Sequence, residues 1–217
     1  MSFTSCASAQ LAASVGVDSD YRFRAYSLSA DHPAASAQLS YDDPSGLYAS
    51  MSGLAELGNG NRFLGVIADA GYARRINEHL TLDAGILRSQ IRSAYPDGVG
   101  FKYTEIYAGA YVGPVAARLY YSPDYRTSGQ STLYGEVEAG FEPLPKWRLS
   151  GHLGLLKYLS TTDYWKAGQT HTDWRVSLGR QLGKFELHSA LIGGGPTYYG
   201  HREHNKPVVT VGGSLNF

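Results

Sequence analysis

The stretch YTEIYAGAYVGPVAARLYY, residues 103 to 121, consists of two alternating segments joined by Gly113 and Pro114. Alternation with a period of two predicts β-strands, and the short Gly-Pro connection predicts that they form a hairpin. The first segment is apolar on one face and carries charge and tyrosine on the other. A soluble sheet buries its apolar face and exposes its charges, so the pattern alone does not decide which face is inside. The two faces comprise Ile106, Ala108, Ala110 and Val112, and Glu105, Tyr107 and Tyr111.

The same alternation recurs along the whole chain, and no comparable helical stripe interrupts it. About twelve segments have roughly the length of 9–11 residues that a tilted membrane strand requires. The other segments are LAASVGVDSDYRFRAY, ASAQLSY, LYASMSG, FLGVIADAGYA, LTLDAGI, TLYGEVEAGF, WRLSGHLGLL, DWRVSLGRQL, FELHSALI and VVTVGGSLNF.

The connections between these segments alternate between tight turns, such as DDPSG, RINEH, EPLPK and GK, and long polar loops, such as SAYPDGVGFK and STTDYWKAGQTH. Outer-membrane barrels have short periplasmic turns at one rim, longer extracellular loops at the other, and an even number of strands. The sequence therefore predicts an all-β fold, a single twelve-stranded antiparallel transmembrane β-barrel over residues 10–217, in a bacterial outer membrane.

The charged face of the strands contains too many ionised groups for a dry core, because isolated buried charges are costly. We therefore expect the apolar face to contact lipid and the charged face to line a hydrated or densely paired lumen. The predicted pore-lining residues are Asp18, Asp20, Arg22, Arg24, Asp69, Asp83, Glu105, Tyr107, Tyr111, Arg118, Tyr120, Tyr134, Glu136, Glu138, Arg148, His152, Arg175, Glu186 and His188. The outward row of the strand FLGVIADAGYA, residues 63–73, is expected to include Leu64, Val66 and Tyr72.

The segment DSDYRFRAY, residues 18 to 26, follows the same alternation. Its four charged residues are expected to face the lumen and to set up a charge gradient along the pore. Tyr21 and Phe23 are expected to face lipid, within an interfacial aromatic belt.

A family resemblance starts at this segment. SDYRFRAYSLSADHPAASAQLSYDDPSGLYASM resembles the N-terminal signature of the TorF-type porins, the proteobacterial Gcw_chp family, in which a Ser-Asp-Tyr-x-Phe-Arg-Gly core precedes a proline-containing loop. Ala25 stands where the family has glycine. The resemblance is sharpest over residues 11–52, and it implies an outer-membrane barrel that passes small solutes. The matching residues are Ser19, Asp20, Tyr21, Phe23 and Arg24.

The two ends of the chain resemble processing and assembly signals. Residues 1–9 are interpreted as the remnant of a signal peptide or a disordered tail, because Ala7-Ser8-Ala9 matches a small-x-small cleavage pattern. Phe217 ends an alternating apolar strand, and it resembles the signal that the barrel assembly machinery recognises.

Several classes of function are excluded by composition and motif. The chain has 19 basic and 19 acidic residues, so it has no nucleic-acid footprint. Gly-x-Ser-x-Gly is absent, and His152 and His188 are predicted to face the lumen, so we do not expect an enzyme. Glu136 and Glu138 are interpreted as pore lining, not as a catalytic pair. The cluster from His201 to His204 is interpreted as a solvated loop, and neither a metal nor a cofactor is expected.

The predicted function is passive diffusion of ions or small hydrophilic solutes. Twelve strands ~4.8 Å apart and tilted ~40° give a backbone diameter on the order of 24 Å, which inward side chains reduce to a narrow opening. Eight acidic against five arginine residues in the predicted lining favour a weak preference for cations. The alternative is a closed structural or adhesive barrel with a salt-bridged interior, and an outer-membrane enzyme is a third hypothesis.

Overall fold

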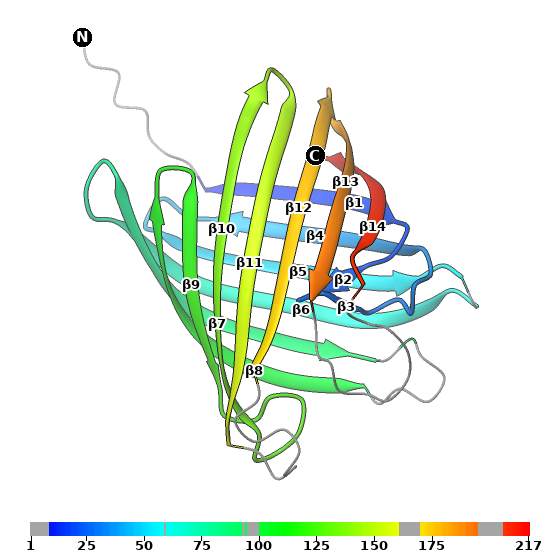
Figure 1. Ribbon diagram of the computed structural model, residues 1–217. Coiled ribbons are helices and arrows are strands. Elements are labelled where there is room, and N and C mark those ends of the chain that lie inside the picture. The colour runs from blue at the N-terminus through cyan, green and yellow to red at the C-terminus, as the bar shows by residue number, and fades with distance from the viewer. Residues whose placement is uncertain (1–8, 59, 93, 95–99, 161–169, 195–205) are drawn as a thin grey trace.

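Twelve antiparallel strands form a closed barrel in the computed structural model, which describes residues 9–58, 60–92, 94, 100–160, 170–194 and 206–217 (Figure 1). This confirms the predicted fold. The barrel strands are β1 (Gln10–Asp18), β4 (Ala34–Asp42), β5 (Leu47–Glu56), β6 (Arg62–Arg75), β7 (Leu80–Ile91), β8 (Phe101–Val112), β9 (Val115–Ser122), β10 (Ser131–Leu144), β11 (Trp147–Ser160), β12 (Thr170–Leu182), β13 (Phe185–Gly194) and β14 (Val208–Asn216).

The barrel closes where β1 pairs with β14, from Ser14 opposite Asn216 to Asp18 opposite Gly212. On its other side β1 pairs with β4 along its whole length. Among the described residues, each barrel strand thus pairs with two neighbours, and the sheet closes without a free edge strand. This arrangement is required in hydrocarbon, where no water can satisfy free N–H and C=O groups.

The two rims of the barrel differ in the length of the connections between their strands. Tight turns such as Gly113-Pro114 and Gly183-Lys184 lie at the rim that carries the start of β1 and the end of β14. Gly113 and Gly183 adopt φ of 56° and 69°, which glycine tolerates without strain. The longer connections lie at the opposite rim, as in outer-membrane barrels, where that rim is extracellular.

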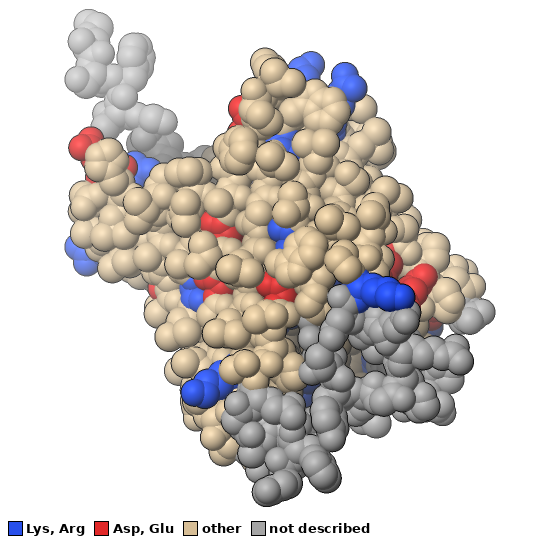
Figure 2. Space-filling view, viewed as in Figure 1, with Lys and Arg blue, Asp and Glu red and all other residues tan. Residues whose placement is uncertain are grey.

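The outer wall is apolar. Leu153 is 61% exposed, Ile106 59% and Phe141 56%, whereas Tyr134 and Glu105, on the opposite face of their strands, are fully buried. Most of the visible described surface belongs to uncharged residues (Figure 2). Such an apolar outer wall fits a barrel in the bacterial outer membrane. None of the described residues forms a helix with the length and hydropathy needed to cross a membrane.

The prediction of one continuous strand over residues 18–26 was wrong. β1 ends at Asp18, and the chain then turns into the barrel, where β2 (Arg22–Phe23) and β3 (Tyr26–Ser27) form a small hairpin (Figure 1). Arg24 and Ala25 form its turn with φ of 50° and 62°. A two-residue hairpin turn of type I′ needs positive φ at both positions, which Asn-Gly normally supplies. The sequence Arg-Ala carries no such signal.

Consequently Tyr21 and Phe23 do not face lipid. Both pack inside the barrel against a buried cluster that includes Leu28 and Leu54. The inward location of these two aromatic residues corrects the assignment to an interfacial belt. The charge gradient expected along a strand from Asp18 to Arg24 is lost for the same reason.

Leu64 is a second correction to the predicted faces. It was expected in the outward row of β6, but it is fully buried inside the barrel. The register between β5 and β6 shifts at Leu54 and Ala55, and Gly65 adopts a φ of 145°. A β-bulge inserts one residue and reverses the alternation beyond it, so Phe63 points outward in place of Leu64.

The two faces of β11 give a stability test. Leu153→Arg places a cation on the lipid face near the middle of the strand, and it should lower the free energy of unfolding by roughly 2–4 kcal/mol. Ser150→Arg, which projects into the lumen, should cost less than about 1 kcal/mol because water can reach it. Urea unfolding in lipid vesicles measures both values. Equal destabilisation by the two variants would contradict the assignment of faces.

Candidate functional site: a constriction in the lumen

The connection between β1 and β4, residues 19–33, is called the inward loop below. Its shape is fixed by Asp20, whose carboxylate accepts hydrogen bonds from Ser27 Oγ at 2.5 Å and Ser29 Oγ at 2.9 Å. Asp20 also pairs with Arg22 Nε at 2.5 Å. Ser29 Oγ in turn accepts a hydrogen bond from the backbone N–H of Tyr21 at 3.0 Å. Asp20 is 7% exposed, so its carboxylate lies in the barrel interior and holds the loop through these hydrogen bonds.

Arg24, at the tip of the inward loop, binds Glu105 of β8 in a bidentate ion pair. The two hydrogen bonds measure 2.9 Å and 2.7 Å, and the side chains are 7% and 0% exposed. The guanidinium also lies over the Tyr134 ring, 3.8 Å from its centroid. Burial lowers the pKa of Arg24 and the Glu105 carboxylate raises it, with a net pKa well above the ordinary value. Arg24 therefore stays charged.

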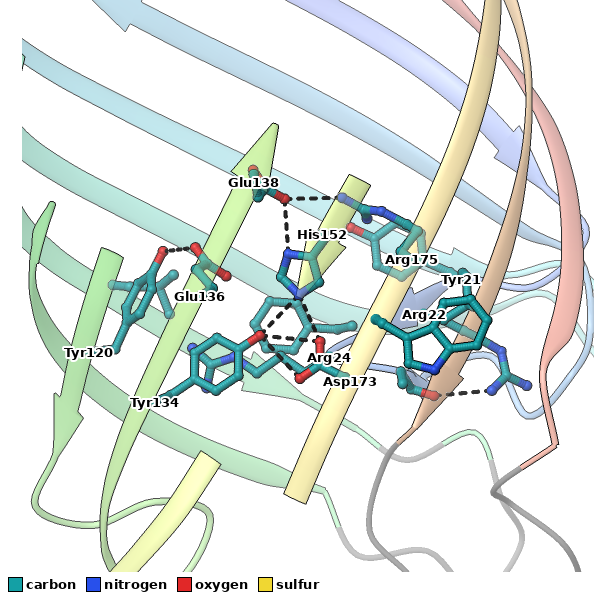
Figure 3. A pocket seen from close by; sticks show the side chains of 15 residues that line it. Tyr21, Arg22, Arg24, Tyr120, Tyr134, Glu136, Glu138, His152, Asp173 and Arg175 are labelled. Carbon is teal, nitrogen blue, oxygen red and sulfur yellow. Dashed lines mark hydrogen bonds and ion pairs between the residues drawn. The ribbon is translucent and has the colours of Figure 1, made fainter. Parts of the chain in front are cut away.

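A second polar cluster lies on β10, β11 and β12. His152 Nε2 lies 2.7 Å from Asp173 Oδ1, and His152 Nδ1 lies 3.2 Å from Glu138 Oε1 (Figure 3). Glu138 also accepts a hydrogen bond from Arg175 at 3.2 Å. The Tyr134 hydroxyl donates to Asp173 at 3.2 Å. The cluster links three neighbouring strands and continues to the Tyr134 ring that packs on Arg24.

A third cluster is centred on Asp83, which is 5% exposed. Its carboxylate accepts hydrogen bonds from Arg118 Nη2 at 2.9 Å and from the hydroxyls of Tyr48 and Tyr111 at 2.9 Å and 3.2 Å. Tyr48 also contacts the Tyr107 hydroxyl at 2.6 Å. These groups come from β5, β7, β8 and β9, so the cluster braces the inner wall on the side away from Asp173.

A cavity of about 220 Å³ lies between the inward loop and the wall formed by β10, β11 and β12. Arg24 and Arg22 belong to the loop side, and Glu136, Glu138 and Arg175 belong to the wall (Figure 3). The Glu136 carboxylate accepts a hydrogen bond from Tyr120 at 2.7 Å. Both signs of charge thus line a space large enough for several water molecules.

The predicted lumen residues fall into several groups in the structure. Arg24 meets Glu105, Arg22 meets Asp20, and His188 meets Asp18 at 2.7 Å. Asp69 accepts a short hydrogen bond from Ser50. Arg148 and Glu186 lie nearer the short-turn rim, on the inward faces of β11 and β13, away from the cavity. The other groups contain Glu138, His152, Arg175 and Tyr134; Asp83, Arg118, Tyr107 and Tyr111; and Glu136 with Tyr120.

Two important lumen residues were missed from the sequence. Asp173 was not selected as a lumen residue. It lies two positions before Arg175 on β12 and therefore on the same face, so the period of two could have identified it. Tyr48 was missed because its strand, LYASMSG, has little charge to mark the inward face. Both residues complete ion-pair clusters. The cluster from His201 to His204 lies outside the described residues.

Phe217 follows β14, and its backbone N–H donates to the carbonyl of Ala13 at 2.8 Å. Its ring is 64% exposed, and Lys184 Nζ lies 6.0 Å from the ring centroid. The residue is therefore available on the outer surface at the short-turn rim. Recognition by the barrel assembly machinery stays a prediction.

The chain matches the family described as "Bacterial protein of unknown function (Gcw_chp)" over residues 3–195. No curated protein matches the chain. The matched region includes the inward loop and all three polar clusters.

Solved structures of similar fold include the NanC porin, with a TM-score of 0.59, 13% identity and coverage of 95% of this chain and 98% of that chain. The KdgM porin has a TM-score of 0.57, 13% identity and coverage of 95% and 99%. The COG4313 outer membrane channel from Pseudomonas putida F1 has a TM-score of 0.51, 14% identity and coverage of 98% and 97%. At this identity the likeness shows the barrel fold.

The Arg24–Glu105 pair gives a prediction for a double-mutant cycle. Glu105→Met leaves a buried cation without its partner and should lower the free energy of unfolding by roughly 3–5 kcal/mol. Arg24→Met combined with Glu105→Met should cost less than the single change, because both desolvated charges are removed. Urea unfolding in vesicles provides the four free energies.

The matched control is the pair of Arg175 and Glu138, whose side chains are 44% and 47% exposed. Its coupling energy should stay below about 1 kcal/mol, since water screens an exposed pair. A coupling energy for Arg24 and Glu105 no larger than that of the control would contradict the role of the buried pair.

Proposed function

Because the chain belongs to the Gcw_chp family of bacterial proteins and folds as a twelve-stranded outer-membrane barrel, we propose that it is a narrow channel for passive diffusion of ions and small hydrophilic solutes. The cavity of about 220 Å³ beside the inward loop is the main support for this proposal. Its lining of arginine, carboxylate and tyrosine groups suits hydrated solutes. The inward loop limits the size of what passes.

Glu136 is the residue that favours cations. Among the ion pairs of the described residues, none includes Glu136, whereas Glu105, Glu138 and Asp83 each face an arginine. The Glu136 carboxylate accepts its hydrogen bond from a neutral tyrosine hydroxyl. A fixed charge in a narrow, low-dielectric lumen acts on passing ions more strongly than one at an exposed surface.

Transport is favoured over catalysis by the position of His152. Both of its ring nitrogens face carboxylates, Asp173 at 2.7 Å and Glu138 at 3.2 Å. A histidine that activates a nucleophile needs one nitrogen within hydrogen-bond reach of a serine or cysteine. His152 instead links the carboxylates of Asp173 and Glu138 on the two flanking strands, as a residue that stabilises the barrel wall would do.

A closed structural or adhesive barrel is the second candidate. It is favoured by the pairing of most lumen carboxylates and by the inward loop, which occupies part of the interior. Ion pairs of this kind can brace a small barrel without a pathway for solutes. Ion conductance distinguishes the two candidates.

Conductance across planar bilayers under a KCl gradient tests the proposal. The purified barrel should give discrete conductance steps and a reversal potential on the cation-selective side. Glu136→Gln should move the reversal potential toward equal permeability of the two ions, because it removes a fixed negative charge beside the pathway. The control Glu78→Gln, in an exposed turn, should leave the potential unchanged. A folded barrel without conductance would overturn the channel and favour the structural role.

A further inference from the structure

The outer wall carries a basic patch on β7 and β8, near the rim with the long connections. Arg88 and Lys102 lie on the outward faces of these strands, and Arg92 follows β7; all three are exposed. Their faces are the lipid-facing ones, because Ile86 is 48% exposed two residues before Arg88 and Ile106 is 59% exposed four residues after Lys102. These three basic residues are called the outer basic patch.

The register brings the patch together. Arg88 lies opposite Thr104, and Gln90, also exposed, lies opposite Lys102. Opposite residues have Cβ atoms ~5 Å apart, and residues two apart along a strand are separated by ~7 Å. Arg88 Nη1 donates to Thr104 Oγ1 at 2.6 Å, which holds the guanidinium against the wall. The backbone N–H of Arg92 donates to the carbonyl of Leu64 at 2.6 Å, which fixes Arg92 at the end of the ladder.

In the part of the chain that the structure describes, no acidic side chain lies beside the patch on this part of the wall. Among the described residues, the outward faces of β6, β7, β8 and β9 carry no aspartate or glutamate, because Asp69, Asp83 and Glu105 all point into the lumen. The arginines of the lumen differ in this respect, since Arg24 and Arg118 each bind a carboxylate. A protein with a formal net charge of zero thus has a locally positive outer surface here.

The depth of the outer basic patch in the membrane determines which part of a lipid can contact it. A basic residue on the lipid face is strongly destabilising at the bilayer midplane but is tolerated near the interface, where its charge stays hydrated. The patch lies at the end of β7 and the start of β8, beyond the apolar row of Ile86 and Ile106. This location corresponds to lipid head groups, whose anionic phosphates are attracted to clustered arginine and lysine.

We propose that the outer basic patch binds the phosphate groups of lipopolysaccharide in the outer leaflet. Arginine binds phosphate oxygens through two parallel N–H donors, and lysine adds a point charge. Gln90 and Thr104 supply neutral polar groups between the cations. The assignment to the outer leaflet follows from the long connections at this rim, which are extracellular in barrels of this type.

Lipid-dependent thermal unfolding tests this site on the folded barrel in neutral detergent. Lipopolysaccharide should raise the unfolding temperature of the unmodified protein. Arg88→Gln combined with Lys102→Gln should weaken lipopolysaccharide binding by roughly 30-fold, since each basic residue near a lipid surface contributes ~1 kcal/mol. Both positions are exposed on the outer wall, so the double variant should fold and keep its thermal midpoint without lipid.

Lys157→Gln is the matched control, because Lys157 is an exposed outward residue on β11 opposite Leu133, away from the patch. It should bind lipopolysaccharide as the unmodified protein does. Inorganic phosphate and phosphatidylglycerol should give smaller shifts than lipopolysaccharide. The proposal is overturned if the double variant binds lipopolysaccharide unchanged, or if Lys157→Gln weakens binding as much. It is also overturned if either other probe matches lipopolysaccharide, which would indicate a general anion or phospholipid site.

Discussion

The buried ion pair between Arg24 and Glu105 organises the barrel interior. It joins the inward loop, which leaves the wall after β1, to β8 across the lumen. The loop turn requires positive φ at Arg24 and Ala25, a conformation that costs energy for residues other than glycine. Burial against Tyr134 and the two hydrogen bonds to Glu105 stabilise it. Since a desolvated charge is tolerated only with its partner, the loop position and the Glu105 charge depend on each other.

A second constraint comes from the membrane. An apolar outer wall forces nearly all carboxylates of the strands inward, where they must find cations, hydroxyls or water. Asp83 and Asp173 find arginine, histidine and tyrosine partners on strands one or two positions away in the barrel. The same groups that polarise the lumen therefore also brace its wall. Glu136 differs because its partner is a neutral hydroxyl, which leaves a charge beside the cavity.

The wall was predictable from the sequence because a period of two places each side chain on one of two faces, and turn length separates the rims. Hairpins such as that of residues 103–121 appear as predicted. The prediction failed where local structure broke that period. The bulge at Gly65 turned the side chain of Leu64 from the outer to the inner face of the wall. The sequence keeps alternating between charged and apolar residues through Arg24 and Ala25, although the backbone turns there and the strand has ended. Contacts across the lumen, such as Arg24 with Glu105, join residues far apart in sequence and have no local signal.

We infer that the inward loop constricts an open pathway through the barrel. Single-channel conductance tests it in a variant that replaces residues 20–31 by a short Gly-Ser linker and carries Glu105→Gln, so that no buried charge is left unpaired. The unmodified barrel should conduct in small steps, and the variant should conduct in steps several times larger. Equal conductance of the two proteins would contradict the constriction, and absence of conductance in both would contradict the channel.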